Sequence, residues 1–341
     1  MKTPSLKVLV TGATGFVGSY LIRLLLEKGY VVRGLRRAGS NLDLIKDLSN
    51  QVDWCEADLT DVVALEEAFS QIDIVFHCAG LASFHPKDVD EMHRVNVAGT
   101  SNIVNLCLHF KVNKLIHVSS IAALGRMKGR LELDEQAPWV ESGDNTAYAI
   151  TKHLAEMEVN RGIAEGLSAV MVMPSVIVGS QYWDKGMALF FAKIDKGMGV
   201  CPSGQSGFVD VRDVVSFMEL MVRAGESGER YILNAVNIPH KRFFELIAKA
   251  LGAKVPGIII GPFLAELAWR VEWLKEKILG ISPLATKESA RASVSKYWYH
   301  NEKSLSIEGF QYRSFEDTIL DTAAAFKQAK ASHLEPVPMP F

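Results

Sequence analysis

The chain has 341 residues, of which 48% are hydrophobic and 22% are charged, enough for one large domain or two moderate ones. Its formal net charge is −2, and no long basic run is present, which disfavours a non-specific nucleic-acid binder. The cysteines are scattered without C-x-x-C spacing, so the pattern predicts neither a zinc site nor a disulfide framework. We find no targeting segment and no apolar stretch of about 18 residues, and therefore expect a cytoplasmic protein without a transmembrane segment.

The first half of the chain alternates short apolar segments with amphipathic ones. Residues 7–11 are predicted to form a buried strand, and residues 15–28 the helix that follows it. The pattern continues with strands at 31–35, 52–56, 72–77, 114–119 and 168–172, and with helices at 42–48, 62–69, 89–110 and 147–165. Such alternation predicts βαβ crossovers, and hence an α/β fold of the Rossmann type with a doubly wound parallel sheet.

After Pro174 the alternation fades. We expect residues 1–178 to form a nucleotide-binding domain to which 208–235 return, and 179–207 with 236–334 to form a smaller, mostly helical substrate lobe. The helix candidates 241–251, 262–279 and 315–330 have no predicted strands between them, and the Pro-rich residues 335–341 are expected to be a loose tail. The amphipathic segment 262–279 is expected to pack on its own domain; a helix on a membrane surface or in a homodimer is the alternative.

A glycine-rich turn lies between the first predicted strand and the first helix. The motif consists of Thr11, Gly12, Ala13, Thr14, Gly15, Phe16, Val17 and Gly18. Gly12 permits a tight turn, Gly15 lets a pyrophosphate approach the backbone, and Gly18 lets helix and strand pack closely. The N-terminus of the helix supplies N–H groups and a partial positive charge for phosphates. In this context the motif predicts a dinucleotide site, with G-x-x-G-x-x-G spacing rather than G-x-G-x-x-G.

The end of the second predicted strand indicates which dinucleotide binds. An NAD site normally has a carboxylate there for the ribose 2′-OH, but this sequence has Arg36 and Arg37 and no acid before Asp43. A carboxylate would repel a 2′-phosphate, whereas a guanidinium holds it in a charge-assisted pair. The two arginines therefore favour NADP(H), with a solvated basic loop as the alternative.

Tyr148 and Lys152 are spaced one turn apart at the start of the predicted helix 147–165. A tyrosine has an unperturbed pKa of about 10, and a nearby ammonium lowers that pKa toward the working range. This spacing alone is common on helix surfaces. However, Ser119 and Ser120 end the strand 114–119 at the carboxyl edge of the sheet, where ligands bind. The combination predicts an active site.

Taken together, these segments resemble the extended short-chain dehydrogenase/reductase family, also described as the NAD-dependent epimerase/dehydratase family. The resemblance covers nearly the whole chain and rests on TGATGFVG, Asp58-Leu59, His77 to Gly80, Asn96, Ser119-Ser120, YAITK, Pro174-Ser175 and FVDVRDV at 208–214. It implies that Ser120 binds the substrate oxygen, that Tyr148 passes the proton, and that Lys152 holds the nicotinamide ribose and lowers the tyrosine pKa. Ser119 competes with Ser120 for the serine role, and the alternative for Ser119 is that its hydroxyl caps the strand end.

The resemblance also implies the cofactor contacts. The cofactor contacts include the glycine turn, Arg36, Arg37, Ser119, Tyr148 and Lys152. Asp58 and Leu59 match the positions beside the adenine, and Cys78, Ala79 and Gly80 match those beside the ribose and phosphates. Asn96 matches a position near the active site, and Pro174, Ser175 and Val176 match those against the nicotinamide. His77, His85, His93 and Cys78 have no recognisable ligand spacing, so we expect no metal.

The segment after the last predicted strand favours one branch of this family. Nucleotide-sugar enzymes of the family commonly carry Arg-Pro-x-Asn there, whereas this chain has Met173-Pro174-Ser175-Val176. The stretch P-S-V-I-V-G resembles the branch of dihydroflavonol reductases, cinnamoyl-CoA reductases and 3β-hydroxysteroid dehydrogenases. We therefore expect NADP-dependent reduction of a small ketone or aldehyde with an apolar or aromatic body. The alternatives are a nucleotide-sugar epimerase or dehydratase and a non-catalytic NADP-sensing regulator, although an intact Ser120, Tyr148 and Lys152 disfavours the regulator.

Overall fold

A parallel sheet with the strand order β11-β7-β5-β4-β1-β2-β3 is the centre of the protein. The computed structural model describes residues 6–127, 129–279, 283, 285–333 and 335–341. The predicted domains also include residues 1–5, 128, 280–282, 284 and 334, which lie outside the described residues. The strands of the sheet are β1 (Lys7–Thr11), β2 (Val31–Arg36), β3 (Asp53–Glu56), β4 (Ile74–His77), β5 (Lys114–Val118), β7 (Ala169–Pro174) and β11 (Arg230–Leu233). The strand order reverses between β1 and β4, which makes their carboxyl ends the place where ligands bind in such sheets.

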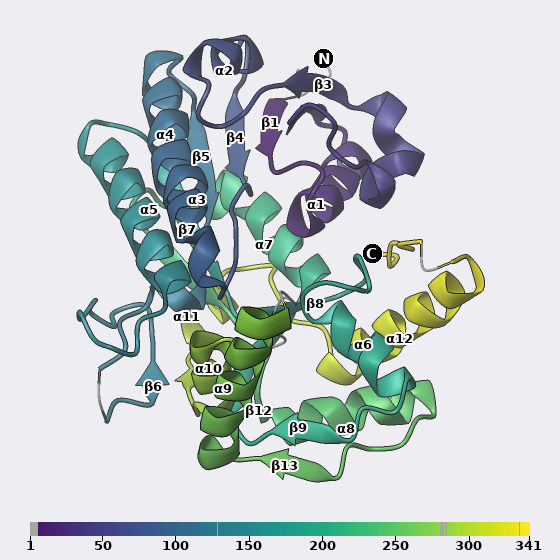
Figure 1. Cartoon of the computed structure of the whole chain (residues 1–341). Helices are drawn as coiled ribbons and strands as arrows, with labels where there is room; N and C mark the ends of the chain where they lie inside the picture. The colour runs from purple at the N-terminus through teal and green to yellow at the C-terminus, as the bar shows by residue number, and fades with distance from the viewer. Residues whose placement is uncertain (1–5, 128, 280–282, 284, 334) are drawn as a thin grey trace.

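Helices cover both faces of this sheet (Figure 1), which confirms the predicted Rossmann-type fold. They are α1 (Phe16–Glu27) and α7 (Val211–Ala224) on one face, and α2 (Val62–Ala68), α4 (Gly99–His109) and α5 (Ala147–Ala164) on the other. Val8 and Val10 belong to one hydrophobic core and Leu9 to the other, because successive strand residues point to opposite faces.

Two predicted helices have a different geometry from the one expected. The segment predicted as one helix over 89–110 consists of α3 (Val89–Met92), the π-helical η3 (His93–Ala98) and α4, which follow one another without a break. The predicted helix 42–48 is the 3₁₀ helix η1 (Asp43–Gln51). Short 3₁₀ segments η2 (Pro86–Asp88) and η4 (Ile121–Ala123) follow β4 and β5. A π-helical turn shifts the side chains that follow it around the helix axis and is often found at functional sites.

The second half of the chain, together with residues 132–133, contains short strands that the sequence pattern did not indicate. They form three small sheets: β8 (Val176–Val178) with β10 (Gln205–Asp210) and β12 (Val236–Pro239), β9 (Val200–Pro202) with β13 (Ile258–Ile260), and β6 (Glu132–Leu133) with β14 (Trp298–Tyr299). The helices there are α6 (Ala188–Asp195), α8 (His240–Leu251), α9 (Pro262–Leu279), α10 (Lys287–Val294), α11 (Glu302–Leu305) and α12 (Phe315–Ala331). These strands have two to six residues and pair with distant segments, so periodicity could not reveal them.

The expected return of 208–235 to the main sheet is correct only in part. β11 joins the sheet beside β7, and α7 packs against α1, but β10 pairs with β8 and β12 in the separate small sheet. The larger hydrophobic core continues from the main sheet into the helices of the C-terminal half, since Tyr20 of α1 and Phe326 of α12 belong to one cluster of buried side chains. None of the described helices is both long and apolar enough to cross a membrane.

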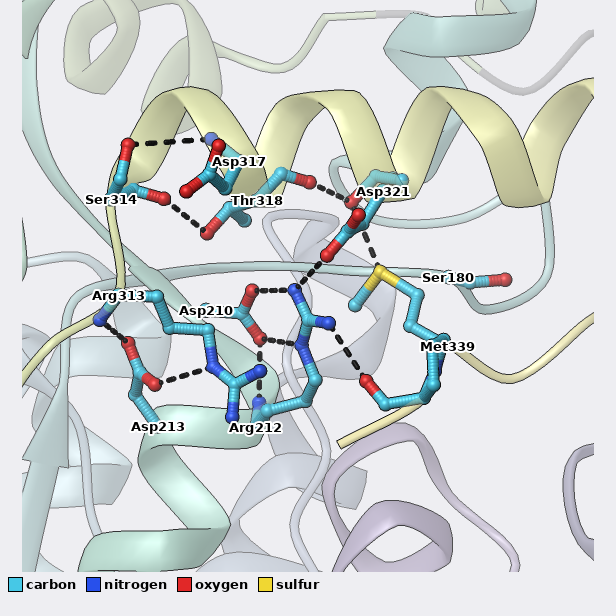
Figure 2. A network of polar contacts seen from close by, with 12 residues as sticks. Ser180, Asp210, Arg212, Asp213, Arg313, Ser314, Asp317, Thr318, Asp321 and Met339 are labelled. Atoms are coloured by element: carbon cyan, nitrogen blue, oxygen red, sulfur yellow. Dashed lines mark hydrogen bonds and ion pairs between the residues drawn. The ribbon is translucent and has the colours of Figure 1, made fainter.

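The prediction of a loose tail over 335–341 is wrong. Met339 is only 2% exposed; its N–H donates to the Tyr20 hydroxyl at 3.0 Å, and its sulfur lies 3.4 Å from the Thr322 hydroxyl. The Pro340 carbonyl accepts a hydrogen bond from the Arg212 guanidinium at 2.8 Å. Figure 2 shows that the same guanidinium contacts the carboxylates of Asp210 and Asp321. Proline content suggested disorder, but the tail fills an apolar site against α1 and α12.

We predict that Met339→Ala lowers the free energy of unfolding by about 2–4 kcal/mol, because it leaves a cavity in the core. Urea denaturation followed by circular dichroism measures this change. Leu320→Ala is the matched control: Leu320 lies on α12 but is 56% exposed, so its removal should change stability by less than about 0.5 kcal/mol. Equal small effects of the two substitutions would mean that the tail does not pack.

Candidate active site

The glycine turn between β1 and α1 lies against the segment that follows β4. Gly12 has φ +65°, and a Cβ atom there would come within 2.7 Å of the Ala79 backbone nitrogen. A Cβ atom on Gly18 would overlap the Gly12 carbonyl oxygen. Both positions therefore require glycine. Gly15 stands exposed at the N-terminus of α1, and no side chain among the described residues caps that helix, so its first N–H groups can receive an anion.

Buried His77 joins the end of β4 to β1 and α4. Its Nδ1 lies 2.7 Å from the Thr11 hydroxyl, and its Nε2 lies 3.0 Å from the Thr100 hydroxyl. Burial lowers the pKa of His77 to about 3, which keeps the ring neutral. The Thr11 hydroxyl also accepts the Ala79 N–H at 3.2 Å. These bonds hold residues 77–79 beside the glycine turn. Among the described residues, no three His, Cys, Asp or Glu side chains are placed to hold a metal ion.

The Lys152 ammonium is buried on α5 next to the end of β5. It is 4% exposed and donates to the Val118 carbonyl at 2.9 Å. Burial lowers the pKa of Lys152 to about 8, and the nearby Glu156 carboxylate raises it. Glu156 itself is buried and lies 3.2 Å from the Arg230 guanidinium. The lysine is therefore held in place, and its pKa depends on both burial and the neighbouring Glu156 carboxylate.

The two adjacent serines have different partners. The Ser119 hydroxyl donates to the Glu156 carboxylate, whereas the Ser120 hydroxyl accepts the Ala122 N–H at 3.1 Å and begins η4. Ser119 thus contributes to the buried network around Glu156 and does not cap the end of β5. Ser120 faces open space together with Tyr148, which favours Ser120 for contact with a substrate.

Tyr148 lies one turn before Lys152 on α5. Burial raises the pKa of Tyr148, while a hydrogen bond with Ser120 lowers it, and the net direction is upward. The expected lowering of this pKa by Lys152 is wrong: the group that lowers it is Ser120, and removal of the phenol from water outweighs that effect. Tyr148 is therefore protonated at neutral pH, which is the form that can donate a proton to a carbonyl oxygen.

Asn96 connects three parts of the site from within the π-helical turn. Its side-chain carbonyl accepts the Leu81 N–H at 2.7 Å, and its amide donates to the Leu81 carbonyl and to the Thr151 hydroxyl. The amide group is thus fully engaged with protein. Asn96 holds the segment that follows Gly80 against α5, next to Lys152, and we regard it as a positioning residue.

Two cavities share Ser120, Tyr148 and Ser175 as walls. The smaller cavity, of about 230 Å³, lies next to the glycine turn and the segment after β4. Its other lining residues are Val17, Cys78, Ala79, Gly80, Leu81, Ala82, Val118, Ser119, Lys152, Pro174 and Ile177. The larger one, of about 510 Å³, extends from Tyr148 to the C-terminal half of the chain and includes Val176 and Phe84. The Ser175 hydroxyl is buried without a hydrogen-bond partner at this junction, so a bound molecule could satisfy it.

Arg36 and Arg37 lie at the carboxyl end of β2, as the sequence predicts. The Arg36 guanidinium is 3.8 Å from the Glu56 carboxylate, and Arg37 is exposed. At the end of the neighbouring strand β3, Asp58 accepts hydrogen bonds from Thr60 and from Arg94. Leu59 is buried and packs against Gly99. Glu56 is a carboxylate beside the arginine pair that motif spacing had not indicated.

The walls of the larger cavity include residues that sequence reasoning missed. They are Arg126, Asn145 and Thr146 before α5, Gln205 and Ser206 in β10, Lys287 and Glu288 in α10, and Tyr297 and Tyr299 near β14. Arg291 of α10 also lines this cavity. Arg126 lies over the Tyr297 ring at 4.4 Å, and one of its terminal nitrogens is buried without a hydrogen-bond partner. No spacing in the sequence links these segments, because only the packing of the C-terminal half brings them to Tyr148.

Known proteins resemble this chain in sequence and in fold. The profile described as "NAD dependent epimerase/dehydratase family" matches residues 8–237. A "Putative dihydroflavonol 4-reductase" from Synechocystis sp. is 30% identical over 332 residues, which cover 93% of this chain and 94% of that protein. "Cinnamoyl-CoA reductase 1" from Oryza sativa is 30% identical over 244 residues, which cover 66% of this chain and 70% of that protein.

A solved structure shows the same architecture. The UDP-glucose 4-epimerase of Thermotoga maritima, solved with UDP-glucose, superposes with a TM-score of 0.78 over 95% of this chain and 100% of that chain. At 20% sequence identity this likeness concerns the fold alone. The family profile and the reductase relatives together establish that the chain belongs to the NAD-dependent epimerase/dehydratase family, the extended short-chain dehydrogenases/reductases.

Proposed function

We propose that this protein is an NADP-dependent reductase of a ketone or aldehyde that has an apolar or aromatic body. The observation that carries the proposal is the convergence of Ser120, Tyr148 and buried Lys152 where the two cavities meet. The reductase relatives support the reaction class.

The residues present fit a nicotinamide dinucleotide. The glycine turn has no room for Cβ atoms at Gly12 and Gly18 and leaves the N-terminus of α1 uncapped. Cys78, Gly80 and Pro174 line the smaller cavity, and the Ser175 hydroxyl there lacks a partner. When bound, the reduced cofactor supplies the hydride. The turn would hold its pyrophosphate, and Lys152 its nicotinamide ribose.

The side chains of the chain supply orientation and the proton. The Ser120 hydroxyl would donate a hydrogen bond to the substrate carbonyl oxygen, which positions it beside the Tyr148 hydroxyl. Tyr148, protonated because burial raises its pKa, would donate its proton to the same oxygen as negative charge develops there. The Lys152 ammonium would stabilise the resulting phenolate. Asn96 would act only through the position of α5 and the segment at Leu81.

The first prediction concerns the cofactor. If Arg36 and Arg37 bind a 2′-phosphate, NADPH should bind more tightly than NADH, and the preference should shrink at high salt. Arg36→Gln or Arg37→Gln should each weaken NADPH binding by about 1.5–3 kcal/mol and leave NADH binding nearly unchanged. Fluorescence titration measures both affinities, and Lys46→Gln, an exposed cation on η1, is the control. Equal titration curves for the two cofactors would remove the NADP assignment.

The second prediction concerns the proton donor. Tyr148→Phe should keep the fold and the NADPH affinity but lower kcat by about 10²–10⁴-fold, because only the transferable proton is removed. Steady-state NADPH oxidation and NADPH titration measure the two effects. Tyr182→Phe, a tyrosine outside both cavity walls, should leave kcat unchanged. A Tyr148→Phe enzyme with near wild-type turnover would show that another acid operates.

The alternative function is the isomerisation or dehydration of a nucleotide sugar. Val176 lines the larger cavity at the position where such enzymes of the family commonly have an asparagine for the sugar diphosphate. A valine there removes hydrogen bonds and presents an apolar wall, which would leave a diphosphate poorly satisfied. The cations Lys287 and Arg291 line the same cavity, so an experiment must decide between the two reactions.

We predict substrate-dependent net oxidation of NADPH with an apolar or aromatic carbonyl compound and no binding of UDP-sugars. A panel of aromatic aldehydes and ketones monitored at 340 nm tests the first part, since NADPH absorbs there, and calorimetry with UDP-glucose tests the second. Micromolar binding of a UDP- or dTDP-sugar, followed by appearance of its isomer with no net change in the cofactor, would replace the reductase by the epimerase.

A further inference from the structure

Helix α9 exposes its apolar side and turns its acidic side toward the protein. Phe263 is 82% exposed and Ile278 is 70% exposed. Between them along the helix, Leu264, Leu267, Val271 and Leu274 are also exposed. With 3.6 residues per turn, these six side chains fall within an arc of about 100°. Ala265, Trp269, Glu272 and Glu276 lie on the opposite side, and all four are less exposed than the stripe. We call the first six side chains the α9 stripe.

Further apolar side chains are exposed on α9 and on the strands next to it. Ile258 and Ile259 of β13, directly before α9, are exposed, as is Val200 of the paired strand β9. Trp273 is half exposed beside the stripe. Soluble monomers rarely leave so many neighbouring large apolar side chains in water, and such a patch usually marks a binding surface.

Cations border the stripe on both sides. On the helix, Arg270 and Lys277 lie along one edge of the stripe and Lys275 along the other, and all three are exposed. The three glutamates of α9 are already paired: Glu266 with Arg270 and Arg291, Glu272 with Lys275, and Glu276 with Lys87. With Arg291 and Lys87 included, five cations accompany these three carboxylates, an excess of two positive charges within this set.

This charge pattern distinguishes between a lipid surface and a second copy of the chain. The apolar positions 264, 267, 271, 274 and 278 have the 3-4 spacing of a helix-pairing seam. In a symmetric pair, however, Arg270, Lys275 and Lys277 of one copy would flank the same cations of the other, and the glutamates beside them, Glu266 and Glu272, are already engaged in ion pairs within the chain. A negatively charged bilayer presents the complementary charge to all three, and lipid chains accept the apolar side chains.

We propose that the α9 stripe and its bordering cations bind the surface of a membrane that contains anionic lipids. The helix lies in the plane of the interface, inserting Phe263, Leu267 and Ile278 and keeping its cations at the headgroups. Glu276 also contacts His85 and Lys87, next to Phe84 of the larger cavity, while α10, packed beside α9 (Figure 1), lines the same cavity. The membrane-binding helix therefore connects two walls of the substrate cavity.

The test is flotation of the full-length protein with lipid vesicles, which requires no turnover and is thus independent of the proposed reductase activity. We expect the protein to float with vesicles of phosphatidylcholine containing one third phosphatidylglycerol, and not with phosphatidylcholine alone. Leu267→Glu with Ile278→Glu should abolish flotation, whereas Val63→Glu with Leu320→Glu, exposed apolar positions on α2 and α12, should not. Lys275→Gln with Lys277→Gln should weaken binding roughly 20- to 30-fold, and Lys249→Gln, an exposed lysine on α8, should have no effect.

A second readout reports on the stripe itself. Anionic vesicles should shift the tryptophan emission of the wild type to shorter wavelength, and Trp273→Phe should lose most of that shift. Circular dichroism of every variant shows whether the fold is retained. Failure to float with anionic vesicles, or flotation that survives Leu267→Glu with Ile278→Glu, would overturn the proposal. A dimer in light scattering that this double variant dissociates, without vesicle binding by the wild type, would assign the stripe to a second copy instead.

Discussion

The close approach of two backbone segments at the carboxyl edge of the sheet is the constraint on which the site depends. The Gly12 turn after β1 meets the Cys78–Ala79 segment after β4 at a distance that excludes any side chain. β1 and β4 are neighbours, and the strand order reverses there, so the connections leave on opposite sides and open a crevice. Neutral, buried His77 joins the end of β4 to the end of β1 through Thr11 and to α4 through Thr100, without adding a charge.

Burial of the Lys152 ammonium is the second demanding feature. Removing an ammonium from water is costly unless polar groups compensate it. Here the Val118 carbonyl accepts its hydrogen bond, and the Glu156 carboxylate one turn away opposes the effect of desolvation on its pKa. Glu156 is in turn held by Ser119 and Arg230. Burial thus lowers the Lys152 pKa to about 8, and a negative group bound nearby would favour the charged lysine. A pKa shifted in this way is common in active sites.

The C-terminal half completes the larger cavity and is anchored to the sheet by burial as well as by polar bonds. The guanidinium of Arg212, at the start of α7, bonds the Asp210 carboxylate (Figure 2). It also contacts Asp321 of α12 and the Pro340 carbonyl, and so joins α7 to α12 and to the final residues of the chain. Removing one member of such a buried group would leave charges without partners. Helix α9 differs, because its glutamates form ion pairs with Lys87 and Arg291 while its apolar side is exposed.

Residue patterns along the chain were enough to predict the parallel sheet, the glycine turn and the places of Ser120, Tyr148 and Lys152 in the order of the elements. These features depend on local periodicity and on residue types required at fixed spacings, which are visible along the chain. The hydrogen-bond partners and the environment of these side chains depend instead on how the chain packs. This packing assigned Ser119 to Glu156, made Asn96 a clamp on Leu81 and Thr151, and raised rather than lowered the Tyr148 pKa.

The same distinction explains the errors in the C-terminal half. The tail at 335–341 has the composition of a disordered segment, and strands such as β9 and β13 are too short to show a period. Their order comes from contacts with segments far away in the chain, such as Met339 with Tyr20. Arg126, Tyr297 and Tyr299 likewise reach the cavity from separate segments. Long-range packing decides these placements because their stabilising contacts exist only after the chain has folded.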